Sequence, residues 1–241
     1  MAEHVLMLSS SRQGTEPFLY HAQQMIAQHL GECRSVLFIP FAGVTRNWDD
    51  YVEAVKDALP DIDVTGIHTT SDPVAAIKQA KANNQAILVG GGNTFNLLTQ
   101  LYLQSLIAPL KEAIANGTVY IGWSAGSNIC GATIRTTNDM PIIAPPSFDA
   151  LGVLPCQLNP HYTDYQPPGH NGETRDERLA EFTKLEPDTP VLAIREGSAL
   201  VLRNGTLSLL GEKEGYVFLG DSKKTITADD NLNEFINRTG Q

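Results

Sequence analysis

The chain has 241 residues, of which 17 are Lys or Arg and 27 are Asp or Glu, so its formal net charge is −10. This balance disfavours a general nucleic-acid binder, because sequence-independent affinity for phosphates needs clustered cations. At 42% hydrophobic and 18% charged residues, the chain carries enough apolar side chains for a sizeable core. Its apolar run at residues 5–8 is far shorter than a signal-peptide core or a membrane span. Neither nucleic acid nor a membrane is therefore an expected partner.

Three cysteines, Cys33, Cys130 and Cys156, cannot all pair with one another, and no two of them have CxxC spacing. Neither a disulfide framework nor a zinc knuckle is expected from this pattern. Reduced thiols in a cytoplasmic protein are the expectation.

In the first half of the chain, apolar runs of strand length alternate with segments of helical periodicity. The expected strands are 5–8, 36–39, 62–67, 86–89 and 118–121. The expected helices are 18–30, 46–59, 73–83 and 93–116, the last with a break at Pro109. Because several of the strands are almost continuously apolar, the pattern predicts an α/β fold with a mostly parallel sheet and helices on both faces.

The alternation becomes looser after residue 135. Residues 140–146 and 165–172 are rich in Pro or Gly, and long loops of this kind in compact domains are often functional. Strand-like runs then follow at 191–194, 199–203, 207–210 and 216–219, with an Asn-Gly turn signal at 204–205. No repeat or charged linker divides the chain, so a single α/β domain over residues 1–241 is expected.

The sequence Gly-Trp-Ser-Ala-Gly at 122–126 is a GxSxG motif that follows an expected strand and precedes a helix of small residues. This order is typical of a nucleophile elbow, in which a strained turn lifts a serine hydroxyl out of the sheet. The free N–H groups at the start of the helix stabilise a negative charge that develops beside them during a reaction. We expect Ser124 to be the nucleophile, although a Gly/Ser-rich turn without chemistry has the same pattern.

A second turn, Gly-Gly-Gly-Asn at 90–93, ends the preceding apolar strand. Both turns lie at the carboxyl ends of strands, where parallel sheets bind ligands. The N–H of Gly91 or Gly92 is therefore expected to form an oxyanion hole with that of Ala125. A nucleotide site is disfavoured because the turn lacks GxGxxG spacing and the chain has no GxxxxGK[ST] motif.

A serine nucleophile needs a general base, and histidine is the usual one near neutral pH. Of six histidines, His161 and His170 lie in the loop-rich second half. His161 is favoured because it closes the run 158–160 before a long loop, and a base must be held by a rigid element. The orienting carboxylate is Glu196, just past a strand end, or Asp139, in a loop. The strand end favours Glu196, and Asp139 stays open as a catalytic or structural residue.

Three motifs together resemble the peptidase E family of aspartyl dipeptidases, which is related to cyanophycinases. They are the segments 90–95 (GGGNTF), 122–128 (GWSAGSN) and 161–165 (HYTDY). The resemblance covers nearly the whole chain and implies a fold similar to class I glutamine amidotransferases, with serine in place of their cysteine. It implies hydrolysis of dipeptides with an N-terminal aspartate, without a metal or other cofactor, by Ser124, His161 and Glu196, and Asp139 also falls in a motif that the family shares. For the mechanism, the expected oxyanion hole is formed by the N–H groups of Gly92 and Ala125.

An aspartyl substrate needs a cation, and the planar guanidinium of arginine suits a carboxylate. Arg175 lies beside the second long loop, in a segment that resembles the substrate pocket of the family, and Asn93 is a further expected substrate-binding residue. An exposed ion pair with neighbouring acids is the alternative for Arg175. For the whole chain, the alternatives are a cyanophycinase-like or other serine hydrolase and a non-catalytic amidotransferase-like binding domain. A small peptide is the expected partner of a monomer or homodimer.

Overall fold

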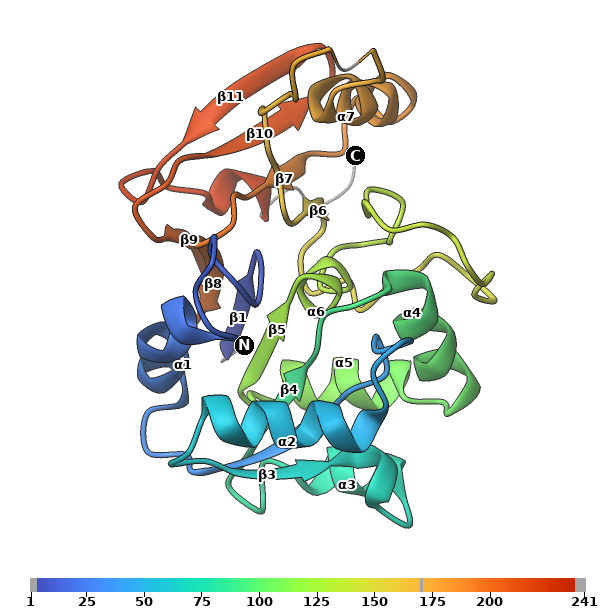
Figure 1. Ribbon diagram of the computed structural model, residues 1–241, viewed down its shortest axis with the longest axis vertical. Helices are drawn as coiled ribbons and strands as arrows, with labels where there is room; N and C mark the ends of the chain where they lie inside the picture. The colour runs from blue at the N-terminus through green and yellow to red at the C-terminus, as the bar shows by residue number, and fades with distance from the viewer. Residues whose placement is uncertain (1–3, 170, 237–241) are drawn as a thin grey trace.

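The computed structural model describes residues 4–169 and 171–236, and its main sheet has seven strands (Figure 1). They are β1 (His4–Leu8), β2 (Ser35–Ile39), β3 (Asp63–Gly66), β4 (Gln85–Val89), β5 (Tyr120–Trp123), β8 (Ala199–Arg203) and β9 (Thr206–Leu210). Their order is β3-β2-β4-β5-β1-β8-β9, parallel from β3 to β1 and antiparallel beyond. The prediction of a mostly parallel sheet is confirmed.

Helices cover both faces of this sheet. The helices of the described residues are α1 (Gln23–Leu30), α2 (Trp48–Ala58), α3 (Pro73–Gln79), α4 (Thr94–Leu103), α5 (Ile107–Ala115), α6 (Ala125–Asn128) and α7 (Arg175–Leu185), with 3-10 turns η1 (Tyr20–Ala22), η2 (Ile67–Thr69) and η3 (Asn233–Phe235). Of these, α7 packs on the second sheet described below. Alternate residues of β1 belong to different clusters, since side chains alternate across a strand. Leu6 and Leu8 pack with α1 and α2, whereas Val5 and Met7 pack with α5 and the segment before β6 (Gln157–Asn159).

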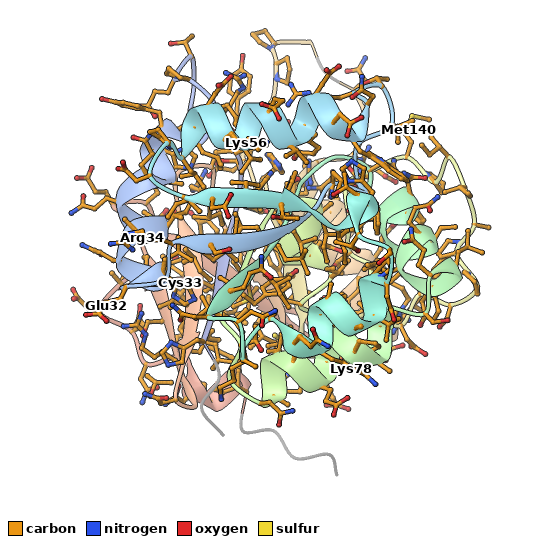
Figure 2. All side chains as sticks on the ribbon, turned by 90° about the horizontal axis from the view of Figure 1, so that it is seen from below. Glu32, Cys33, Arg34, Lys56, Lys78 and Met140 are labelled. Carbon is orange, nitrogen blue, oxygen red and sulfur yellow. The ribbon has the colours of Figure 1, made fainter. Side chains whose placement is uncertain are left out.

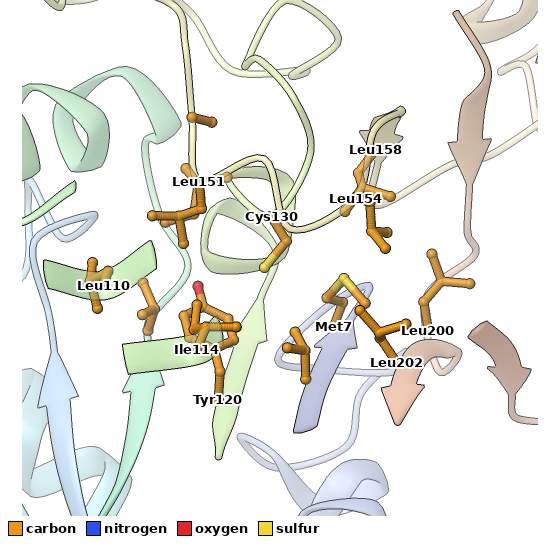
Figure 3. Packing of buried hydrophobic residues seen from close by; sticks show 14 of the residues in the cluster. Met7, Leu110, Ile114, Tyr120, Cys130, Leu151, Leu154, Leu158, Leu200 and Leu202 are labelled. Atoms are coloured by element: carbon orange, nitrogen blue, oxygen red, sulfur yellow. The ribbon is translucent and has the colours of Figure 1, made fainter. Parts of the chain in front are cut away.

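Figure 3 shows the second of these clusters, to which Met7, Ile114, Tyr120, Leu154 and Leu200 all belong. These side chains come from segments far apart in the sequence and are all almost fully buried. The cluster includes Ala125, the first residue of α6, and α6 directly follows the turn at which the functional site is built.

The helix α2 shows how local sequence defines an element. Its N-cap is Asn47, whose side chain accepts a hydrogen bond from the Asp50 amide, and acidic residues in the first turn complement the helix dipole. Tyr51, Val52 and Val55 are buried on one face. Lys56 of the same helix, labelled beside α2 in Figure 2, keeps 44% of its side chain exposed and pairs with Glu53. The helix therefore buries an apolar stripe on the sheet and leaves its charges in solvent.

A second, four-stranded sheet, ordered β11-β10-β7-β6, lies with α7 at the opposite end of the molecule from α2 and α3 (Figure 1). Its further strands are β7 (Val191–Ala193), β10 (Gly215–Leu219) and β11 (Ser222–Ile226). The four strand-like runs of the second half are confirmed as β7, β8, β9 and β10. The sequence did not indicate β6, which is only three residues long, or β11, whose first four residues are exposed.

The break expected at Pro109 is wrong. The helical segment is interrupted before Ile107 instead, where Ser105 has a positive φ of 57°. Pro109 lies inside the first turn of α5, where the missing N–H has no helical partner to lose. Within the described residues, no helix combines the length and the apolar character needed to cross a membrane.

Candidate active site

Ser124 lies at the turn between β5 and α6, with φ 53° and ψ −110°. A non-glycine residue rarely adopts such angles, and strain of this kind concentrates at functional sites. Neighbouring hydrogen bonds hold the turn in place. The Ser124 amide donates to the Leu8 carbonyl at 3.1 Å, and the Ser127 hydroxyl donates to the same carbonyl at 2.6 Å. The expected strand-turn-helix elbow is therefore present, anchored to the end of β1.

The glycines of the motif are required by close backbone contacts. A Cβ on Gly126 would lie 2.2 Å from the Val89 carbonyl oxygen, and a Cβ on Gly122 would lie 2.4 Å from the Gly126 carbonyl oxygen. Real Cβ atoms do not approach backbone atoms this closely. The sharp turn at Ser124 thus depends on both glycines of GxSxG.

His161 follows β6 and has a positive φ of 56°. Its backbone N–H donates to the Ser9 hydroxyl at 2.9 Å, and that hydroxyl donates to the Ile194 carbonyl at 2.8 Å. The next amide, of Tyr162, also donates to the Ile194 carbonyl. Ser9, directly after β1, therefore joins the histidine segment to the end of β7.

Glu196 lies in the loop after β7. The residue before it, Arg195, forms a bidentate ion pair with Asp164, at 2.9 and 2.7 Å, three residues after His161. Hydrogen bonding to Arg195 lowers the pKa of Asp164 to about 2. This ion pair joins the segments that carry His161 and Glu196.

The three predicted catalytic side chains form one hydrogen-bonded row. The Ser124 Oγ lies 2.8 Å from His161 Nε2, and His161 Nδ1 lies 2.7 Å from Glu196 Oε1. The carboxylate accepts a hydrogen bond from the Nδ1–H, which keeps the proton on Nδ1 and leaves Nε2 free to accept the serine proton. This is the arrangement of an activated serine nucleophile.

The amides of Gly92 and Ala125 lie beside this row. Gly92 has φ 140°, and neither amide donates to an acceptor in the part of the chain that the structure describes. A Cβ on Gly91 would lie 2.9 Å from Ser124 Cβ, which shows how closely the glycine turn approaches the nucleophile. Both free N–H groups are thus available for an oxyanion.

The row opens into a pocket of about 570 Å³. Ser124, His161, Gly92 and Asn93 all line it. Sequence reasoning missed several other lining residues, among them Ser11, Arg12, Phe18, Arg46 and Tyr51. Position after the end of β1 is a signal that could have indicated the Ser9–Arg12 segment. Tyr51 lies within the expected helix 46–59, and no local signal marked it as part of the site.

Asp139, the other candidate for the acid, bonds elsewhere. Its Oδ2 accepts hydrogen bonds from the Thr94 amide at 2.7 Å, from the Thr94 hydroxyl at 2.6 Å and from the Thr137 hydroxyl at 3.2 Å. It thereby stabilises the start of α4, where a negative charge is favourable. The Asn93 side chain caps the same helix by accepting from the Asn96 amide, and it donates to the Met140 carbonyl. His170, the alternative base, lies outside the described residues.

Arg175, the predicted substrate cation, is the first residue of α7 and lies in a separate cavity of about 240 Å³. Thr163, two residues after His161 in the sequence, and Arg178 also line this cavity. Arg175 Nη1 is buried and has no hydrogen-bond partner among residues 4–169 and 171–236. Burial and the nearby Arg178 lower the pKa of Arg175. The neighbouring acids Asp176 and Glu173 pair with Lys223 and Arg178 instead, so the expected alternative of an ion pair is not formed.

Comparison with known proteins finds similar chains and a matching family model. A family model described as "Peptidase family S51" matches residues 5–210. The chain is 53% identical to a "Peptidase E" of Shewanella putrefaciens, over 94% of this chain and 95% of that protein, and 52% identical to one of Shewanella amazonensis, over 96% and 98%. The crystal structure of a putative peptidase E protein from Listeria monocytogenes superposes with a TM-score of 0.68 at 25% identity, covering 88% of this chain and 100% of that one.

Proposed function

Because this chain belongs to peptidase family S51, and is therefore a peptidase with a fold like that of class I glutamine amidotransferases, we propose that it hydrolyses dipeptides with an N-terminal aspartate by serine catalysis. The observation that carries the proposal is the unbroken row from Ser124 through His161 to Glu196, at 2.8 and 2.7 Å, beside two free amides.

The mechanism follows from the roles of these groups. His161 Nε2 accepts the proton of the Ser124 hydroxyl while Oγ attacks the carbonyl carbon of the peptide bond. The N–H groups of Gly92 and Ala125 stabilise the anionic oxygen of the tetrahedral intermediate. The C–N bond breaks as His161 gives its proton to the leaving amine, and an acyl-enzyme remains. Water, deprotonated by His161, then releases the aspartate and restores the serine.

The preference for aspartate rests on the cavity of Arg175. The protein has a net charge of −10, so its average field opposes an anionic substrate, and a local cation must hold the carboxylate. Arg175 offers a buried guanidinium nitrogen without an acceptor, and such a group gains from a charge-assisted hydrogen bond. Thr163 and Asp164, which follow His161 closely in the chain, line this cavity, so the segment that carries the proposed base also borders the proposed cation site.

A reducing, cytoplasmic location is part of the same proposal. Cys33, Cys130 and Cys156 are all unpaired and buried. Unpaired thiols are usual in reducing compartments, and burial raises the pKa of Cys130 and Cys156 to about 12, which makes these thiols unreactive.

The test combines labelling of the nucleophile with a dipeptide panel. A fluorophosphonate probe should label wild type at Ser124, leave Ser124→Ala unlabelled, and show a serine hydrolase. Asp-Leu should be hydrolysed far faster than Asn-Leu, Glu-Leu or Leu-Asp, and Ser124→Ala should hydrolyse none. Labelling with turnover only of esters or cyanophycin-type peptides would identify another serine hydrolase. Absence of both labelling and turnover would leave a binding domain.

A further inference from the structure

Tyr51 connects the aromatic core to the glycine turn beside the nucleophile. It lies on α2, is only 5% exposed, and lines the same pocket as Ser124. Its hydroxyl donates a hydrogen bond to the Gly91 carbonyl at 2.9 Å and accepts one from Trp123 Nε1 at 3.0 Å. Trp123 directly precedes the nucleophile, so these two bonds join the two sides of the proposed oxyanion hole.

The tyrosine ring is held on several sides. Phe38 contacts it edge to face, with centroids 5.0 Å apart, and also stacks on Trp123 at 5.6 Å. Phe18 adds edge contacts to both rings, at 6.2 and 6.0 Å. Such aromatic packing leaves little freedom for the ring. Burial raises the pKa of Tyr51 to about 12, so the hydroxyl keeps the proton that it donates.

The Gly91 carbonyl and the Gly92 N–H belong to one planar peptide group, and in a trans peptide they point in opposite directions. Glycine residues otherwise leave this peptide free to rotate. A carbonyl held by Tyr51 therefore sets the direction of the Gly92 N–H on the other side. That N–H has no acceptor among the described residues, and Gly92 lines the Ser124 pocket.

We propose that Tyr51 is a positioning residue for the oxyanion hole, which orients the Gly91–Gly92 peptide so that the Gly92 N–H meets the anion of the tetrahedral intermediate. The role rests on the proposed function. Tyr51 itself contacts neither the serine proton nor the histidine. Its loss is therefore expected to weaken transition-state binding and to leave ground-state binding almost intact.

The test compares Tyr51→Phe with Tyr102→Phe. Both variants lose one tyrosine hydroxyl that donates to a backbone carbonyl at 2.9 Å, but Tyr102 bonds to Asp149 and lies outside the Ser124 pocket. Phenylalanine keeps the ring packing, so both variants are expected to fold, and circular dichroism gives the folded fraction by which rates are corrected. Removal of an oxyanion donor lowers kcat by about a hundredfold or more, and misorientation of one should cost about tenfold.

For Tyr51→Phe we expect kcat on Asp-Leu to fall about tenfold with KM nearly unchanged. The affinity for a peptide boronic acid, which forms a tetrahedral adduct, should fall in parallel. Tyr102→Phe should match wild type in both. A Tyr51→Phe enzyme with wild-type kcat and boronate affinity would overturn the role of Tyr51 while the proposed function stands. A wild-type protein without turnover or fluorophosphonate labelling would overturn the function and this role with it.

Discussion

The exchange of Glu196 for glutamine tests which carboxylate supports the histidine. Glu196 Oε1 lies 2.7 Å from His161 Nδ1, whereas Asp139 bonds to Thr94 and Thr137. Glutamine keeps the size of the side chain and removes its charge. The variant therefore loses the electrostatic stabilisation of the imidazolium that forms when His161 takes the serine proton.

The size of this loss follows from the exposure of the pair. Two unit charges about 4 Å apart attract one another by about 1 kcal/mol in water and by about 4 kcal/mol near a protein surface. The His161 and Glu196 side chains are 38% and 48% exposed, which places the pair in the lower half of that range, at about 2 kcal/mol. Since about 1.4 kcal/mol corresponds to a tenfold change, kcat should fall about thirtyfold with KM little changed.

The assay is steady-state hydrolysis of Asp-Leu by wild type, Glu196→Gln and Asp139→Asn. The asparagine can still accept the Thr94 amide through its side-chain oxygen, so Asp139→Asn should lower thermal stability and keep a kcat close to that of wild type. An unchanged kcat in Glu196→Gln, together with a strongly lowered kcat in Asp139→Asn, would refute the assignment of Glu196 as the acid.

Arg175→Met should lower kcat/KM for Asp-Leu by roughly ten- to a hundredfold, because a charge-assisted hydrogen bond is lost, and should change that for Asn-Leu little. Arg175→Lys should recover only part of the kcat/KM for Asp-Leu, since an ammonium cannot bind both carboxylate oxygens in fork geometry. If Arg175→Met keeps the wild-type ratio of kcat/KM for Asp-Leu to that for Asn-Leu, another residue determines the specificity. The Asp164–Arg195 ion pair should show in the pH dependence of stability. Arg195 lowers the pKa of Asp164 from 3.8 to about 2. The ion pair therefore contributes to the free energy of unfolding above about pH 4, and this contribution is lost as the pH falls toward 2. Because the Asp164 side chain is 53% exposed, Asp164→Asn should lower stability at pH 6 by about 1 kcal/mol or less, and the Tm difference from wild type should shrink at pH 2.5; a difference that is constant with pH would contradict this.

Local patterns in the sequence were sufficient for the sheet and for the elbow. Apolar runs such as 36–39 and 86–89 became the buried strands β2 and β4 because a strand covered on both faces must be apolar throughout. Glycines on both sides of Ser124 were visible as GxSxG, and the turn depends on them. An apolar run and the GxSxG spacing are both patterns of adjacent residues, so the sequence alone reveals them even though tertiary contacts explain why they are needed.

The sequence indicated that a serine, a histidine and a carboxylate would act together, but it did not decide which histidine and which carboxylate. His161 had His170 as a rival, and Glu196 had Asp139, because nothing in a linear pattern measures distance across 37 or 35 residues. Tertiary contacts bring the favoured residues together: Ser9 at the end of β1 holds the histidine backbone, and the Arg195–Asp164 ion pair joins the two loops.

Tertiary structure alone revealed the surroundings of the nucleophile. Tyr51 was only one residue of the expected helix 46–59. Its hydroxyl reaches Gly91, 40 residues away, because α2 packs on the same face of the sheet as Trp123. Arg175 likewise had acids on both sides in the sequence, and only the fold pairs those acids with other cations and leaves its Nη1 without an acceptor. A hydrogen bond or an ion pair depends on which side chains packing brings within about 3 Å, and packing is decided by the whole chain.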